Sequence, residues 1–281
     1  MIVKTKKIKS NRLDDNQVIK KCLSIQFSLD GFSFCIYEPE MKIFLAYSKY
    51  VFDHKINTPE KLLKAIQQIF LKDAELQHDF NSISAIHDNE LITFVPNAFF
   101  DEDNLKEYLK YNNKVLATDF FAHDAIKNQE MKAVFIPYMN INNYLFDHFG
   151  SFDYRHASAI LVETLLEDYA SKELQVFVRL SDNFYKLVIT KNRQLLFFNT
   201  FKFQTSEDFM YYLLFTLEQL EIDTNTQKIL FLGEVDKHQE LIELSKKYLN
   251  QVSLLEPKLI ETETNLNSTV LRENLELFHS L

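Results

Sequence analysis

Glycine is the residue type on which nucleotide chemistry in this chain would depend. A loop that cradles a phosphate needs glycine where its backbone must approach the ligand closely or take a positive φ angle. The 281-residue chain contains only three glycines, Gly31, Gly150 and Gly233. Average usage, roughly 7%, would give about twenty. The low count is typical of a genome poor in G and C, but it still leaves few positions for a phosphate loop.

Aspartate and histidine are adjacent at several places, and these pairs are candidates for metal ligation. They are Asp53-His54, His87-Asp88, His123-Asp124 and Asp147-His148. Adjacent residues on a strand point to opposite faces, and the sequence has no HExxH motif or similar spacing that would bring two ligands together. We therefore interpret the pairs as surface polar residues and predict no metal site.

Motifs for covalent catalysis are absent from the sequence, which has no GxSxG elbow, Walker loop or Cys–His pattern. We predict no catalytic residue. Cys22 and Cys35 fall on neighbouring predicted strands, but no export signal is recognisable, so both are expected to stay reduced and to act as small core residues.

Composition and charge limit the class of protein. The chain is 46% hydrophobic and 25% charged, as expected of a soluble globular protein, and no apolar run is long enough to span a membrane. Residues 1–20 begin with a basic stretch, which we interpret as an exposed arm. The net charge of -9 disfavours nucleic acid as a partner. We expect a cytoplasmic protein of two domains.

The same order of elements is predicted twice along the chain. Period-2 hydrophobic patterns predict three strands in each half, over residues 22–29, 32–38 and 41–50 and over residues 174–182, 183–190 and 194–203. A helix follows each set, the first capped by Thr58 ahead of Pro59 and the second by Thr205 with Asp208. We predict a duplicated fold, with domains at 21–155 and 156–281.

Further elements are expected as insertions in the first half and at the junction of the two halves. The pattern predicts a strand over residues 115–121 and a bridging helix over about residues 156–171. His156, at the start of that helix, is expected either to face the cleft between the domains as a binding residue or to make a structural hydrogen bond.

Two tandem domains, each opening with three antiparallel strands and a crossover helix, resemble the superfamily of actin, hexokinase and the heat-shock chaperones. Residues 94–102 and 108–112 are also similar to a segment of the bacterial family catalogued as domain of unknown function 3822, as are residues 135–138 and 156–159. The resemblance implies an α/β, actin-like and ribonuclease H-like fold of mixed sheets, without an assigned activity.

The resemblance also suggests where a nucleotide would bind. Superfamily ATPases carry a phosphate loop at the first hairpin of each half, usually an Asp followed closely by Gly and then Thr or Ser. The first hairpin contains Asp30, Gly31 and Ser33, and the second contains Asp182. In the superfamily a loop that contacts adenosine follows a strand of the second half, and Gly233-Glu234 occupy that position here. Each also fits an ordinary turn; Asp182 could instead hold Mg²⁺ through water.

These loops are degenerate, and we therefore favour a function without ATP hydrolysis. The expected protein is a binding or scaffold module that takes a protein partner through its interdomain cleft and needs no cofactor. The alternative is an enzyme or switch that binds Mg-ATP through divergent phosphate loops. The sequence leaves the oligomeric state open.

Overall fold

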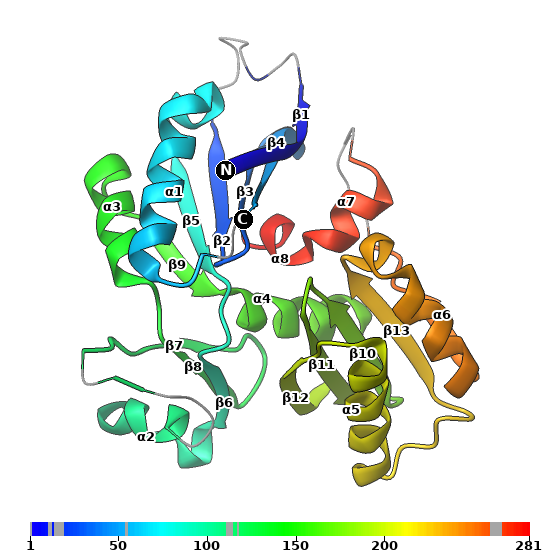
Figure 1. Ribbon diagram of the computed structural model, residues 1–281. Helices are drawn as coiled ribbons and strands as arrows, with labels where there is room; N and C mark the ends of the chain where they lie inside the picture. Colours follow the sequence, from blue (N-terminus) through cyan, green and yellow to red (C-terminus); the bar gives the residue numbers. More distant parts are fainter. Residues whose placement is uncertain are drawn as a thin grey trace. The chain divides into compact units, whose positions relative to one another are not determined.

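The structure is a computed structural model, which describes residues 2–10, 13, 20–53, 56–110, 115–116, 118–258 and 266–281 (Figure 1). The chain divides into two compact units. Unit 1 comprises Met1–Leu161, Leu259–Leu266 and Glu276–Leu281, and unit 2 comprises Val162–Lys258 and Asn267–Leu275. The division falls within helix α4 (Ala157–Thr164), a few residues after the predicted boundary.

Unit 1 is built on a six-stranded sheet with the order β1-β4-β3-β2-β5-β9. The strands are β1 (Ile2–Lys9), β2 (Cys22–Phe27), β3 (Gly31–Glu38), β4 (Ile43–Phe52), β5 (Ser82–His87) and β9 (Asp153–His156). The first four pair antiparallel, whereas β5 lies parallel to β2 and β9 parallel to β5. Helices α1 (Pro59–Lys72) and α3 (Met139–Phe149) lie side by side against the sheet (Figure 1).

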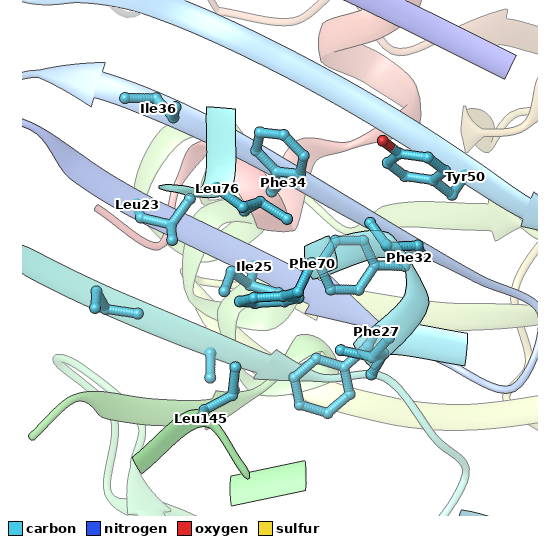
Figure 2. Packing of buried hydrophobic residues seen from close by; sticks show 14 of the residues in the cluster. Leu23, Ile25, Phe27, Phe32, Phe34, Ile36, Tyr50, Phe70, Leu76 and Leu145 are labelled. Atoms are coloured by element: carbon cyan, nitrogen blue, oxygen red, sulfur yellow. The ribbon is translucent and has the colours of Figure 1, made fainter. Parts of the chain in front are cut away.

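The core of unit 1 follows from the alternation of its strands. Phe32, Phe34 and Ile36 of β3 share one face, where they join buried residues of β2 and α1 (Figure 2). The rings of Phe32 and Phe70 lie edge to face at 6.1 Å. Helix α1 begins as predicted, because the Thr58 side chain accepts a hydrogen bond from the Lys61 amide and Pro59 occupies the first turn.

The prediction of an exposed N-terminal arm was wrong over Ile2–Lys9. This segment forms the edge strand β1 and pairs antiparallel with β4. Its basic residues have a structural partner, since the Nζ atoms of Lys7 and Lys9 lie 2.8 and 3.4 Å from Oε1 of Glu75, whose side chain is only 3% exposed. Most of residues 10–20 lie outside the described part of the chain.

A smaller sheet follows in unit 1, with the order β6-β8-β7. It consists of β6 (Ile92–Pro96), β7 (Ala122–Ala125) and β8 (Met131–Phe135), and the short helix α2 (Leu105–Leu109) packs on it. The predicted strand at 115–121 was wrong where the structure describes it. The Leu116 amide donates to Oδ2 of Asp119 at 2.7 Å, so this segment turns before β7 begins.

Unit 2 contains a five-stranded sheet with the order β12-β11-β10-β13-β14. Its strands are β10 (Gln175–Leu180), β11 (Phe184–Lys191), β12 (Gln194–Lys202), β13 (Lys228–Gly233) and β14 (Gln251–Leu254). Helices α5 (Ser206–Gln219) and α6 (Gln239–Tyr248) pack together in its core (Figure 1). The order and directions match those of β4-β3-β2-β5-β9 in unit 1, so the same topology occurs twice.

Local signals set the boundaries of α5. The Thr205 side chain accepts from the Asp208 amide, and the Asp208 carboxylate accepts from the Thr205 amide, forming the predicted capping box. The predicted bridging helix is shorter and less regular, because His156 ends β9, α4 covers Ala157–Thr164, and a π-helical turn follows over Leu165–Tyr169.

The C-terminal helices are α7 (Ser268–Glu273) and α8 (Leu275–Phe278). In unit 1, the ring of Phe278 packs against Phe44 and Tyr47, and the Cys35 thiol donates to the Leu277 carbonyl. Cys22 and Cys35 are both free, and Cys35 is buried as predicted. Every helix in the described residues falls short of the length and apolar character needed to cross a membrane.

Candidate functional site

Backbone amides of the first hairpin donate hydrogen bonds to a side chain just before the turn. Ser28 Oγ accepts hydrogen bonds from the amides of Asp30 and Gly31, each at 3.2 Å. A Cβ on Gly31 would lie 2.7 Å from the Tyr50 carbonyl oxygen, so the close passage of β3 beside β4 requires glycine here. Ser33 is buried within β3, paired with Gln26 and Lys49. These contacts explain Gly31 and Ser33 without a ligand.

The second hairpin and the turn after β13 come together in unit 2. Nζ of Lys237 lies 2.9 Å from Oδ1 of Asp182 and 3.0 Å from Oε2 of Glu234. Burial lowers the pKa of Lys237, but the carboxylates of Glu234 and Asp182 outweigh it and raise the pKa overall. Both carboxylates are among the residues predicted from the sequence. Lys237 is not, and its only signal in the sequence is its position three residues after Glu234.

Gly233 has a structural role in the same turn. Its φ angle is +82°, and a Cβ there would lie 2.2 Å from the Leu180 carbonyl oxygen. The Glu234 amide donates to that same oxygen at 3.0 Å. The Glu234 amide is therefore used to hold the turn against the end of β10.

Carboxylates gather near the first hairpin at the carboxyl ends of β2 and β5, the edge where ligands bind in many open α/β sheets. The Gln26 amide group donates to Asp88 at 3.2 Å, and the Asp88 amide donates to the Phe27 carbonyl at 3.0 Å. Burial raises the pKa of Tyr138, and the carboxylates of Asp88, Asp30 and Glu90 raise it further, against an opposing hydrogen bond with Asn89. Without a bound cation, this charge opposes a polyphosphate.

His87 is buried at this edge, contrary to the prediction of a surface residue. Its Nδ1 accepts from the Tyr138 amide at 3.0 Å, so the proton lies on Nε2, which is 2.9 Å from Oδ1 of Asn142. Burial lowers the pKa of His87 to about 3, despite the hydrogen bond with Asn142. The imidazole is therefore neutral at physiological pH and serves to join β5 to α3.

His156 also has structural partners. It is completely buried at the end of β9, where Nδ1 accepts from the Ser158 amide at 3.0 Å and Nε2 lies 3.3 Å from Oδ1 of Asn89. Asn89 in turn donates to the Ile136 carbonyl at 2.9 Å. This arrangement favours the expected structural hydrogen bond over direct contact with a ligand.

The remaining Asp–His pairs lie at separate places in the chain. His54 lies outside the described residues, His148 is exposed on α3, and His123 lies on β7. Among the residues that the structure describes, no cluster of three or more His, Cys, Asp or Glu side chains could hold a metal ion.

A groove in unit 1 escaped the sequence reasoning. It has a volume of about 580 Å³ and lies between the start of β5, strand β7 and strand β9; its lining includes Ser82, His123, Asp124, Tyr154 and Arg155. Nε of Arg155 lies 3.8 Å from Oδ2 of Asp124, which connects β9 to β7 through side chains. A groove of this size can hold a small molecule or a short stretch of peptide.

Comparisons with known structures identify the class of fold. A crystal structure from Bacteroides thetaiotaomicron, described as a protein with actin-like ATPase fold and unknown function, is similar with a TM-score of 0.74 and 20% identity, over 86% of this chain and 93% of that one. The PilM-PilN type IV pilus biogenesis complex is similar with a TM-score of 0.61 and 11% identity, over 92% of this chain and 96% of that one. The predicted actin-like fold is confirmed.

The family to which the chain belongs is also identified. Residues 10–252 match the model of the family described as protein of unknown function (DUF3822), and the chain belongs to this family, as the resemblance suggested. The ethanolamine utilization protein EutJ from Carboxydothermus hydrogenoformans shares the fold with a TM-score of 0.50 and 7% identity, over 96% of this chain and 95% of that one. Comparison with curated proteins found no sequence match.

Proposed function

We propose that this chain is a module that binds a protein partner and does not hydrolyse ATP. The proposal rests on one observation: the backbone amides of the two candidate phosphate loops already donate hydrogen bonds within the chain. The amides of Asp30 and Gly31 donate to Ser28 Oγ, and the Glu234 amide donates to the Leu180 carbonyl. A phosphate would have to displace these internal hydrogen bonds before it could be cradled.

Electrostatics support the same proposal. The carboxylates of Asp88, Asp30 and Glu90 all raise the pKa of Tyr138, so three carboxylates lie near the first hairpin. One of the similar structures is the PilM-PilN type IV pilus biogenesis complex. At 11% identity this similarity concerns the fold alone, but it makes partner binding a reasonable function for such a fold.

The direct test is Mg-dependent ATP turnover by the purified chain. We expect phosphate release no faster than in a buffer blank. Release well above the blank would contradict the proposal if it disappeared in both Asp30→Ala and Asp182→Ala, because a contaminating ATPase would not respond to these substitutions.

The alternative function is an ATP-binding enzyme or switch, and one observation favours it. Asp182, Glu234 and Lys237 gather beside Gly233 in unit 2. The carboxylates could hold Mg²⁺ through water and the ammonium group could contact a phosphate. Nucleotide binding that is lost in Asp182→Ala or Lys237→Met would support this alternative, and the absence of binding by the unaltered chain would remove it.

A further inference from the structure

Two edge strands border the groove of unit 1. In the sheets that the described residues form, β7 pairs only with β8, and β9 pairs only with β5. Three consecutive residues of each strand, 122–124 and 153–155, line the groove. An edge strand presents backbone N–H and C=O groups along its open side, which an extended peptide can satisfy by adding as a further strand.

The lining suits the side chains of an extended segment. Ile83, Phe152 and Tyr154 offer apolar surface, and the small residues Ser82 and Ser84 leave room beside them. Because successive side chains of a strand point to opposite sides, alternate residues of a bound segment would face this surface.

The charge around the groove indicates whether a bound segment should be basic or acidic. Asp124 and Asp153 line the groove, and Glu102 lies 3.3 Å from His123 at its wall. These three carboxylates stand against one guanidinium group, that of Arg155. The whole chain has a net charge of -9. Electrostatic complementarity therefore favours a basic segment over an acidic or phosphorylated one.

We propose that this groove binds an extended, basic segment of a partner protein, which adds as a strand to the open edge of β7 or β9. The inference rests on the proposed partner-binding function and names the site and the chemistry of the ligand. The backbone pairs with the edge strand, a Lys or Arg side chain lies near Asp153, and apolar side chains cover Tyr154.

The test is selection of displayed random peptides on the immobilised full chain, followed by titration of a synthetic copy of the most enriched sequence. We expect alternating apolar residues with at least one Lys or Arg. Asp153→Lys, which reverses a charge in the groove, and Ser82→Trp, which fills it from an exposed position, should each weaken binding about tenfold or more. Asp147→Lys, a matched charge reversal exposed on α3, should leave binding unchanged.

Amide hydrogen exchange with and without the synthetic peptide supplies the second measurement. Strand addition should slow exchange in β7 or β9, because newly paired amides are protected. Equal binding by Asp153→Lys and Asp147→Lys, an acidic consensus, unchanged exchange in both strands, or no enriched peptide would each overturn the inference.

Melting curves of all variants check that they fold. ATP turnover by the same preparations separates the two proposals: turnover would contradict the proposed function, whereas peptide binding that ignores the groove variants would contradict only this site.

Discussion

The surroundings of individual glycines are evidence against a phosphate loop. At Gly233 the φ angle is positive and the Leu180 carbonyl leaves no room for a Cβ, whereas Gly150 has a similar φ of +79° and open space around it. Gly233→Ala should therefore lower the free energy of unfolding by about 2 kcal/mol or more, and Gly150→Ala by about 1 kcal/mol. Urea unfolding measures both.

This pair of variants separates a structural glycine from a functional one. If Gly233→Ala costs no more than Gly150→Ala, the close approach to Leu180 does not explain Gly233. The absence of a side chain at this position would then point to a ligand, as the alternative function requires.

His87 gives the residue-scale prediction for pH. Its folded pKa of about 3 lies below the ordinary value of 6.5, so below pH 6.5 the unfolded chain binds a proton that the folded chain does not. The stability that neutral His87 contributes is present above pH 6.5 and is lost as the pH falls toward 3. Between pH 6.5 and 5.5 this loss should be about 1 kcal/mol.

The check is urea unfolding of the unaltered chain and of His87→Gln across that pH range. The variant should be less stable throughout, but its stability should depend less steeply on pH. An identical slope in His87→Gln would show that His87 is not the group responsible.

At the scale of elements, β1 depends on a charge interaction at a distance in the sequence. Glu75 is almost completely buried, and Lys7 and Lys9 neutralise it from the edge strand. Replacing both lysines by methionine should cost about 1 to 2 kcal/mol, because the carboxylate loses its partners. Adding Glu75→Gln should recover part of that loss.

A double-mutant cycle in urea unfolding measures the coupling. Purely additive effects would mean that β1 is held by its backbone pairing with β4 alone. A positive coupling would explain why a basic segment, which looks like a solvated arm, forms a strand.

The elements predicted well are those whose signals are local. Thr58 with Pro59 and Thr205 with Asp208 fix helix starts through contacts within one turn, and the strand alternation needs only neighbouring residues. Strand β1 depends on distant partners, strand β4 and Glu75, and a single sequence does not reveal them.

The same distinction applies to the candidate site. Asp182 and Glu234 were identifiable from their places after strands, and the structure joins them through Lys237. The groove was not identifiable, because β5, β7 and β9 each contribute a few ordinary residues to it. Only the pairing of the chain into sheets makes those residues neighbours.

At the scale of the whole molecule, one topology is used twice while the loops that would bind a nucleotide are engaged internally. Both units have the strand order of the actin-like fold. In the first hairpin the amides of Asp30 and Gly31 donate to Ser28 Oγ, and in the turn after β13 the Glu234 amide donates to the Leu180 carbonyl. The architecture is thus compatible with a binding protein that keeps the fold and does not use ATP.

The most direct measurement of that claim is the melting temperature of the chain with and without excess Mg-ATP, Mg-ADP and a non-hydrolysable analogue. A nucleotide at about a hundredfold over its Kd would stabilise the chain by about 2.7 kcal/mol, or roughly 2–4 °C. We predict no shift at millimolar nucleotide. A shift of that size, lost in Asp30→Ala or Asp182→Ala, would contradict the account and establish the nucleotide-binding alternative.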